Sequence, residues 1–237
     1  MTDAIGPGFE GVTYGDKSLA AATECMQCLE AGKPIPPFHK QRSTLLPMAV
    51  AMILCQEERV IILDFGGGLG IGFMTLAESI PMDLCRVGYT IVEGPQVSAL
   101  GARTLGNMVS YTATLPTTGE YSLIHAASSL QYIEDWQGLL QQLTALEARY
   151  ILLSDVSAGH IKTFATLQNY YGCLIPHWFL NLDELMEVFS KHGYTLKMQT
   201  FASSRRLDVA DALPMDNFPE TCRLPQTLHM LLQRLSP

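Results

Sequence analysis

The segment VIILDFGGGLG, from Val60 to Gly70, decides how this chain can fold. A run of residues typical of a buried strand leads into four glycines between positions 66 and 70. Glycines can simply end a strand or allow close packing, but they also let the backbone approach a ligand closely. In open α/β sheets, ligands bind where a strand gives way to the N-terminus of a helix. The segment therefore predicts an α/β domain with a ligand-binding loop, which we call the glycine loop (residues 66–70).

Beyond this loop, short apolar runs alternate with helical patterns. Strands are expected at 60–65, 86–93, 108–113, 121–127, 149–156, 194–202 and 227–235. Helices are expected at 71–79, 96–106, 136–148 and, capped by Asn181, at 182–193. The alternation implies right-handed crossovers and a mostly parallel sheet of seven strands, closed by an antiparallel last strand. Between them, residues 163–180 form an aromatic-rich segment without a clear period.

Residues 1–58 precede this alternation and form the first of two expected units. They predict two helices, one at 18–31 capped by Asp16 or Ser18, and one near 44–56. We expect this helical segment to fold as a lid over the binding domain, residues 59–237, and to exclude water. Its polar residues near the site would be Tyr14, His39, Lys40 and Arg42.

Composition excludes several classes of partner. Fifteen Lys and Arg against 23 Asp and Glu give a net charge of −8, so nucleic acid is not expected. The longest apolar run, residues 45–55, is too short to span a bilayer, and no signal-peptide pattern precedes it. The simplest expectation is a cytoplasmic protein, with a homodimer left open. Of six cysteines only Cys25 and Cys28 form a close pair, so no metal site is expected.

The spacing of the glycines discriminates between two cofactors. A dinucleotide fingerprint needs a third glycine or alanine three positions after the second, where this chain has Ile71 or Phe73 in the two registers. The pattern that fits is an acid followed by alternating glycines, at Asp64, Gly66, Gly68 and Gly70. This pattern favours S-adenosylmethionine over NAD.

With a second strand ending at Glu93, the chain resembles the class I S-adenosylmethionine-dependent methyltransferases. The segments LDFGGGLG, ASSLQYIEDW, RYILLSD and TLQNYYGCLIPHWFLNLDEL followed by HGYTL are similar to a small group of bacterial members with little assigned chemistry. The resemblance covers about Val60 to Leu196 and implies a Rossmann-like class I methyltransferase fold with seven strands.

The resemblance also implies the cofactor contacts. The glycine loop would cradle the methionine portion, Glu93 would accept from the ribose hydroxyls, and Asp64 would support the loop. The third strand leads to YTATLP, which lacks the acid that often meets the adenine amine in this family, so contacts there are assigned by position. The implied set is Asp64, Gly66, Gly67, Gly68, Gly70, Glu93, Gly94, Thr112, Ala113, Ser128 and Ser129.

Methyl transfer needs alignment of the reactants and, for a protonated acceptor, a base. His177 is the one histidine considered as that base, while His125 is expected to be a satisfied strand residue. The neighbours Tyr170 and Tyr171 should point in opposite directions, so only one would face the site. The candidate catalytic residues are Gln131, Tyr132, Asn169 and Tyr171.

Three functions remain open at this level. The first is methyl transfer to a small molecule in specialised metabolism, since no large insertion is present to recognise a macromolecule. The second is cyclisation of S-adenosylmethionine to azetidine-2-carboxylic acid with release of methylthioadenosine, as in azetidine-2-carboxylate synthases, which the chain resembles in its lid and aromatic segment. The third is a non-enzymatic cofactor-binding protein.

Overall fold

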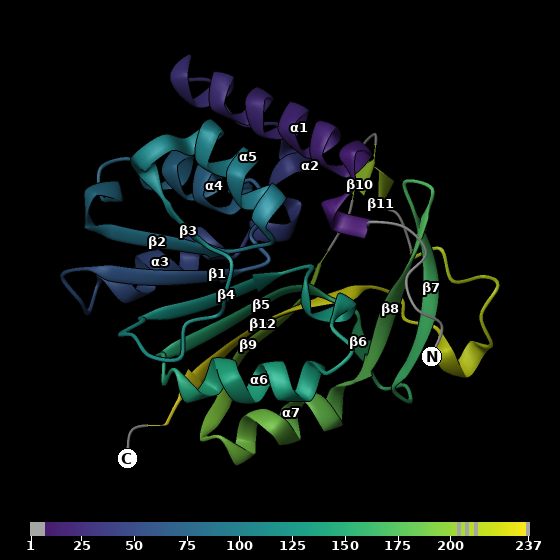
Figure 1. Ribbon diagram of the computed structural model, residues 1–237. Helices are drawn as coiled ribbons and strands as arrows, with labels where there is room; N and C mark the ends of the chain where they lie inside the picture. Colours follow the sequence, from purple (N-terminus) through teal and green to yellow (C-terminus); the bar gives the residue numbers. More distant parts are fainter. Residues whose placement is uncertain (1–7, 203–204, 207–208, 211–212, 236–237) are drawn as a thin grey trace.

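The computed structural model describes residues 8–202, 205–206, 209–210 and 213–235, and its centre is a seven-stranded sheet (Figure 1). The strand order is β3-β2-β1-β4-β5-β12-β9, and only β12 runs antiparallel to its two neighbours. The predicted α/β fold with a mostly parallel sheet of seven strands is confirmed, including the antiparallel last strand. The strands are β1 Val60–Phe65, β2 Val87–Val92, β3 Ser110–Thr112, β4 Leu123–Ala127, β5 Tyr150–Val156, β9 Tyr194–Ala202 and β12 Thr227–Arg234.

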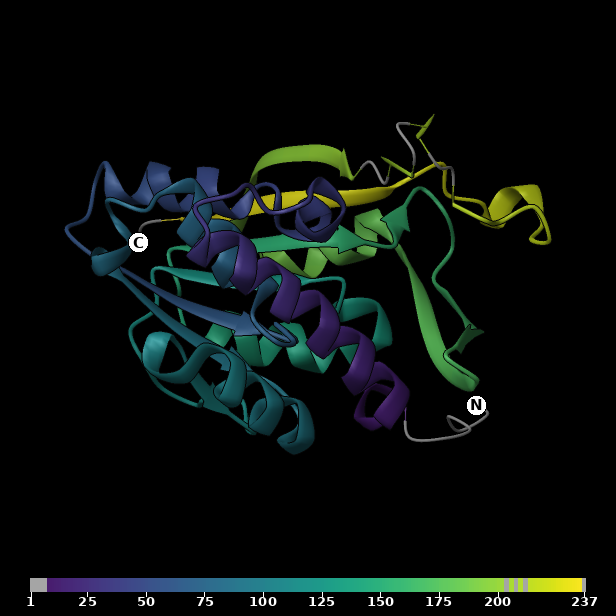
Figure 2. The same ribbon diagram turned by 90° about the horizontal axis from the view of Figure 1, so that it is seen from above.

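Helices cover both faces of this sheet, as the two views show (Figures 1 and 2). One face buries a cluster of apolar side chains against α6 (Trp136–Ala145) and α7 (Leu182–Lys191). The other face buries a second cluster against α1 (Val12–Glu30), α3 (Leu46–Leu54), α4 (Ile71–Ser79) and α5 (Pro95–Leu105). Burial on both faces explains the nearly continuous apolar character of the central strands. No helix in the described part of the chain is long and apolar enough to cross a bilayer.

The first helix begins earlier than the sequence predicts. α1 starts at Val12 after an extended Gly11, so neither Asp16 nor Ser18 caps it, and that prediction is wrong. The helix gains its stability from packing, because α1 contacts both α4 and α5 and buries Ala22 and Cys25. Tertiary contacts of this kind override a local capping signal.

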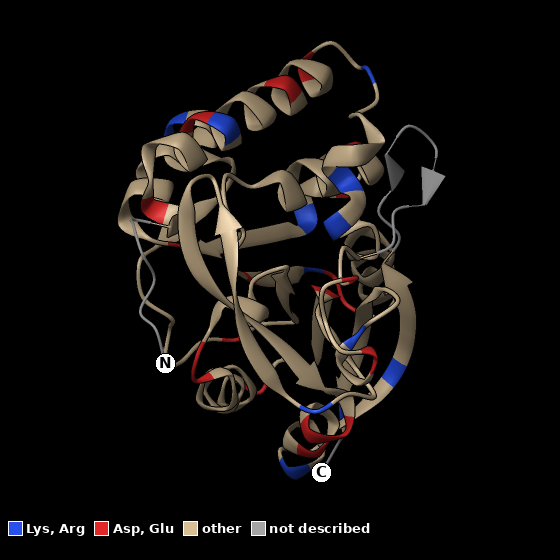
Figure 3. Cartoon of the chain, turned by 90° about the vertical axis from the view of Figure 1, so that its right-hand side faces the viewer, with Lys and Arg blue, Asp and Glu red and all other residues tan. Residues whose placement is uncertain are grey.

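The aromatic segment that lacked a clear period is a β-hairpin. β7 (Phe164–Tyr170) pairs antiparallel with β8 (Cys173–Asn181), and Tyr171 and Gly172 form the turn with φ of 50° and 82°. Two consecutive residues with positive φ match the turns that suit tight hairpins. The hairpin extends from the body and carries no charged residue between its ends (Figure 3).

Short elements complete the described chain. They are α2 Pro37–Lys40, β6 Ala158–Gly159, β10 Arg205–Arg206, β11 Val209–Ala210, η1 Gly8–Glu10, η2 Gln41–Ser43, η3 Leu84–Arg86, η4 Gly106–Met108, η5 Leu130–Tyr132 and η6 Glu220–Cys222.

Candidate functional site

The glycine loop joins β1 to α4 and is held by two close approaches. Gly66 has φ of 68°, and a Cβ built there would lie 2.6 Å from the Cβ of Ser129, at the end of β4. A Cβ on Gly67 would lie 2.4 Å from Oδ2 of Asp64. The loop is therefore held between the end of β4 and the Asp64 carboxylate, where no larger residue fits.

Asp64 supports the loop from inside the sheet. Its side chain is buried, accepts a 2.7 Å hydrogen bond from the Tyr89 hydroxyl, and lies 2.9 Å from Nδ1 of His125. His125 is fully buried and its Nε2 lies 3.2 Å from Oγ of Ser154. His125 is therefore hydrogen-bonded through Nε2 only, while its buried Nδ1 lies near the Asp64 carboxylate without making a hydrogen bond, so the expectation of a fully satisfied strand residue holds for one nitrogen.

Glu93 joins the loops that follow β1 and β2. One carboxylate oxygen accepts from the backbone N–H of Gly68 at 2.9 Å, and the other from that of Gly94 at 3.0 Å. Burial raises the pKa of Glu93, while these two hydrogen bonds oppose the rise. Each oxygen keeps a lone pair with which it can accept from a ligand hydroxyl.

A cavity of about 300 Å³ opens above these loops at the carboxyl ends of the strands. Four aromatic rings from separate parts of the chain close one side of it, and we call them the aromatic cluster: Phe9, Tyr14, Tyr132 and Tyr170. The Phe9 ring is central, with its centroid 4.8 Å from that of Tyr132 and 5.1 Å from that of Tyr170. The complete lining is Phe9, Tyr14, Arg42, Phe65, Gly66, Val92, Glu93, Gly94, Ala113, Ala127, Ser128, Ser129, Tyr132, Ile133 and Tyr170.

The N-terminal segment contributes one cation to this lining. Arg42 lies with its Nε 3.4 Å from Oδ2 of Asp155 and keeps most of its side chain exposed. Of the other basic candidates in this segment, His39 pairs with Glu24 and Lys40 with Glu78, away from the cavity. A guanidinium with one weak partner at the mouth of a cavity can bind a carboxylate.

The structure brings seven of the fifteen predicted cofactor-binding and catalytic residues to the cavity lining, and Asp64, Gly67, Gly68 and Gly70 are not among those seven. Seven predicted residues line it: Gly66, Glu93, Gly94, Ala113, Ser128, Ser129 and Tyr132. Thr112 does not line it, and its hydroxyl donates to the carbonyl of Thr114 instead. Of the two residues assigned by position at the end of the third strand, Ala113 lines the cavity and Thr112 does not.

Three of the four catalytic candidates do not reach the cavity. Gln131 is buried below it and donates to Oγ of Ser128 and the carbonyl of Asp155. Asn169 is exposed because odd-numbered residues of β7 face away from the body. Tyr171 lies in the hairpin turn, 43% exposed, with Nζ of Lys17 4.1 Å from its ring centroid.

Sequence reasoning missed several residues that line the cavity. They are Phe9, Phe65, Val92, Ala127 and Ile133. Ile133 follows the predicted Tyr132, and Phe65 precedes the glycine loop, so proximity in sequence could have found both. Phe9 carries no local signal, since only the fold brings it against a hairpin more than a hundred residues away.

His177 lies behind the cavity wall. Its ring stands edge-on to Tyr132, with centroids 5.2 Å apart, and its nitrogens contact Ser157 and Gln168. Burial lowers the pKa of His177 to about 4, so the ring is neutral near pH 7. A neutral ring inside a hydrogen-bonded network suits a structural role better than that of a base working on the ligand.

Acid should destabilise the protein through this histidine. An unfolded His has a pKa near 6.5, so between pH 6.5 and 4 the unfolded chain binds a proton that the native chain does not. The stabilisation by His177 is present above about pH 6.5 and is lost as pH falls towards 4. Between pH 7 and 4, wild type should lose up to about 3 kcal/mol more unfolding free energy than His177→Asn, measured by urea denaturation.

Equal losses in wild type and in His177→Asn would contradict the burial argument.

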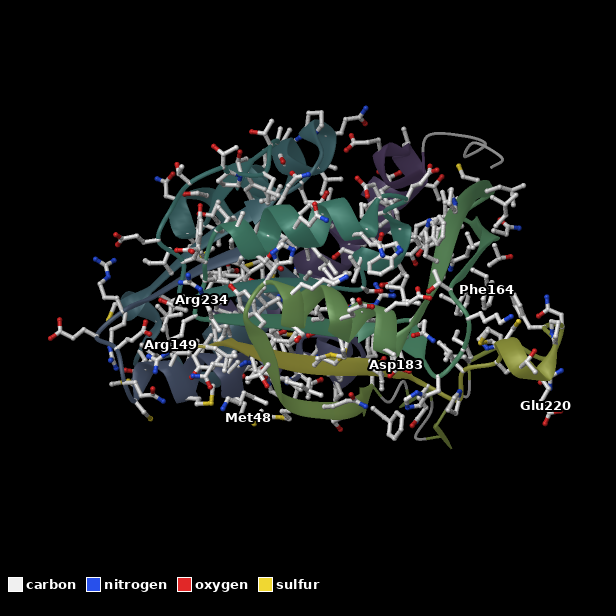
Figure 4. The ribbon with its side chains drawn as sticks, turned by 90° about the horizontal axis from the view of Figure 1, so that it is seen from below. Met48, Arg149, Phe164, Asp183, Glu220 and Arg234 are labelled. Atoms are coloured by element: carbon white, nitrogen blue, oxygen red, sulfur yellow. The ribbon has the colours of Figure 1, made fainter. Side chains whose placement is uncertain are left out.

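A larger hollow, of about 480 Å³, lies at the opposite end of the sheet. Arg149 and Arg234 lie there together, far from Phe164 on the hairpin (Figure 4). Arg149 pairs with Glu57 at 2.9 Å and Arg234 with Glu147 at 2.5 Å. Paired surface charges at the amino ends of parallel strands are unlike the sites where such sheets bind ligands.

Solved structures share this architecture at low sequence identity. A protein complexed with the Trm112 methyltransferase activator of Haloferax volcanii aligns with a TM-score of 0.57 at 15% identity, covering 94% of this chain and 97% of that one. The magnesium protoporphyrin IX methyltransferase of Synechocystis, with bound S-adenosylmethionine, aligns at 0.54 and 13%, covering 84% and 80%. The 1,6-didemethyltoxoflavin-N1-methyltransferase of Burkholderia thailandensis aligns at 0.51 and 16%, covering 94% and 91%.

The chain has the Rossmann-like fold of class I methyltransferases. No protein-family model and no curated protein matches the sequence. Within this methyltransferase fold, the glycine loop, Glu93 and the cavity share the end of the sheet where β1, β2 and β4 terminate. Cys25 and Cys28 are free thiols, and the described residues include no group of three or more acids, histidines and cysteines that could hold a metal.

Proposed function

We propose that this protein binds S-adenosylmethionine in the cavity and transfers its methyl group to a small molecule. The observation that carries the proposal is the joint position of the glycine loop and Glu93 in a cavity at the carboxyl ends of the strands. The methyltransferase fold supports it, and two of the similar structures hold S-adenosylmethionine or S-adenosylhomocysteine.

The groups in the cavity fit each part of this cofactor. Glu93 offers carboxylate lone pairs to the ribose hydroxyls, and Arg42 offers a cation to the methionine carboxylate. Aromatic faces stabilise a nearby cation by about 0.5–2 kcal/mol, which suits a sulfonium. When bound, the cofactor would supply an electrophilic methyl carbon. Ala113 would lie on the adenine side, as its position suggests, together with Gly94 and Ile133, which also line the cavity.

Residues 1–58 act in this proposal as the lid. Phe9 and Tyr14 reach over the cavity, and Oε2 of Glu10 accepts from the backbone N–H of Gln96 at 3.2 Å. These contacts join the N-terminal segment to the start of α5. Closure by such a segment excludes water and aligns the reacting groups.

The size of the cavity indicates a small acceptor. About 300 Å³ lies at the lower end of the range for ligand sites, so a bound cofactor leaves little room beside it. The hydroxyl-bearing residues that line the cavity are Tyr14, Ser128, Ser129, Tyr132 and Tyr170. Burial raises the pKa of Tyr132 to about 12, so this phenol stays protonated and acts by positioning.

The small size and aromatic lining of the cavity also favour a second candidate. The α-amine of S-adenosylmethionine can attack its own γ-carbon, forming the ring of azetidine-2-carboxylic acid. The C–S bond breaks, and methylthioadenosine leaves with the electron pair. This reaction needs a folded methionine chain and no acceptor, so a small cavity suits it.

Product analysis distinguishes the two reactions. With S-adenosylmethionine alone, a methyltransferase should leave the cofactor intact apart from slow background decay. With a suitable acceptor it should release S-adenosylhomocysteine, detected by mass spectrometry. Methylthioadenosine and a ring amino acid formed without an acceptor would support cyclisation and contradict methyl transfer as the main activity.

Cofactor binding without either product would support a non-enzymatic binding protein. Heat-inactivated protein is the control for spontaneous decay. If calorimetry detects no binding of S-adenosylmethionine, both enzymatic proposals fail.

A further inference from the structure

The hydroxyl of Tyr132 is held by a chain of three polar side chains behind the cavity. It lies 3.1 Å from Oε1 of Gln168, and the same oxygen lies 3.1 Å from Nδ1 of His177. Nε2 of His177 lies 2.9 Å from Oγ of the buried Ser157. These hydrogen bonds therefore run from Ser157, just after β5, through the hairpin to the cavity wall.

The direction of these hydrogen bonds follows from the chemistry of the groups. An amide oxygen only accepts, so both Tyr132 and Nδ1 of His177 must donate to Gln168. A neutral imidazole carries one N–H, which places the proton on Nδ1 and makes Nε2 an acceptor for the Ser157 hydroxyl. The donor and the acceptor of each hydrogen bond in this series are then fixed.

The Tyr132 oxygen can act only as a hydrogen-bond acceptor towards a ligand. Its only proton is given to Gln168, so any further hydrogen bond at this oxygen must come from a donor. Arg42, which lines the same cavity, offers donors and no acceptor. A donor-only cation and an acceptor-only hydroxyl match the two charged ends of an α-amino acid, its carboxylate and its ammonium.

The position of Tyr132 relates this hydroxyl to the amino-acid end of the proposed cofactor. Tyr132 belongs to η5, and its backbone N–H donates to the carbonyl of Ser129 at 3.1 Å. Ser129 is the residue against which Gly66 packs. The ring thus stands beside the glycine loop, where the methionine portion is proposed to bind.

We propose that Gln168 and His177 are positioning residues that make Tyr132 a hydrogen-bond acceptor for the ammonium group of S-adenosylmethionine. This inference rests on the proposed function. Gln168 and His177 do not touch the ligand; they act through the phenol.

The tautomer of His177 tests the orientation without any ligand. Long-range ¹H–¹⁵N spectra of ¹⁵N-histidine protein at pH 7 should show His177 as the Nδ1–H tautomer, assigned by the loss of its signals in His177→Asn. In Gln168→Leu, where Nδ1 loses its acceptor, the tautomer should change or become mixed. The Nε2–H tautomer in wild type would overturn the inference, because it reverses every bond in the chain.

Binding tests the consequence of that orientation. Tyr132→Phe keeps the ring and removes the acceptor, so its affinity for S-adenosylmethionine should fall about tenfold, as for a hydrogen bond to a charged group. Its affinity for 5′-methylthioadenosine, which lacks the amino-acid end, should change less than twofold. Tyr194→Phe, which removes a buried hydroxyl bonded to the carbonyl of Ala148 far from the cavity, should leave both affinities unchanged.

Two substitutions of His177 distinguish a positioning role of its Nδ1–H from a packing role of its ring. His177→Asn keeps a donor near the position of Nδ1 and should bind S-adenosylmethionine more tightly than His177→Phe, which has none. Equal affinities of wild type and Tyr132→Phe for S-adenosylmethionine would overturn the inference. If wild type binds no S-adenosylmethionine at all, the proposed function fails, while the tautomer still reports on the hydrogen-bond chain.

Discussion

Replacing Asp64 with alanine is expected to lower the free energy of unfolding by about 3–5 kcal/mol, because it removes one partner of a buried polar pair. The Tyr89 hydroxyl would lose its acceptor, and Nδ1 of His125 would lose the carboxylate that lies 2.9 Å from it, in a buried site. Chemical denaturation followed by circular dichroism measures the loss.

Asp64→Asn is the informative comparison, since its amide oxygen can still accept from Tyr89. Asp64→Asn should lower the free energy of unfolding by less than Asp64→Ala does. Glu58→Ala removes an exposed carboxylate at the start of the same region and should change stability by less than about 0.5 kcal/mol. An Asp64→Ala protein as stable as wild type would show that the carboxylate does not organise the loop.

Gly66→Ala is expected to lower the affinity for S-adenosylmethionine by about 10- to 100-fold. A positive φ in a non-glycine residue costs about 1–3 kcal/mol, and here the new Cβ would also lie 2.6 Å from the Cβ of Ser129. The loop must move to relieve both effects, which changes the shape of the cavity. Isothermal titration calorimetry measures the change in affinity.

Gly32→Ala is a matched control, because Gly32 has φ of 61° but no atom within 4 Å of the added Cβ. It should lose some stability and retain wild-type affinity. The double variant Gly66→Ala, Ser129→Gly should bind more tightly than Gly66→Ala alone, since it removes the clash. Equal affinity in both would mean that the contact with Ser129 does not shape the loop.

The sheet, the glycine loop and Glu93 could be predicted because their signals are local. A buried parallel strand is continuously apolar, and the glycines follow it directly in the chain. The resemblance to class I methyltransferases then placed Glu93 at the next strand end, and the structure puts it in the cavity.

Side-chain direction at the hairpin could not be predicted in the same way. The register of β7 turns Gln168 and Tyr170 inwards and Asn169 outwards, and a shift by one residue would reverse all three. Tyr170 and Tyr171 were expected to point in opposite directions, and that prediction is wrong: Tyr171 lies in the turn and the two ring centroids are 4.6 Å apart. Of the two residues, Tyr170 alone lines the cavity.

Contacts between segments far apart in the sequence could not be predicted either. The start of α1 depends on packing against α4 and α5, and Phe9 meets Tyr132 and Tyr170 only in the folded protein. Gln131 follows the predicted strand end, yet its amide turns inwards to Ser128 and the Asp155 carbonyl. Each of these outcomes is fixed by long-range packing, which one sequence does not display.

The most direct test of the account is a crystal structure of the protein grown with S-adenosylmethionine. The nucleoside is expected in the cavity, with its ribose hydroxyls on Glu93 and its methionine portion against the glycine loop. A cavity that stays empty at saturating S-adenosylmethionine, or the same molecule bound at another place on the chain, would contradict it.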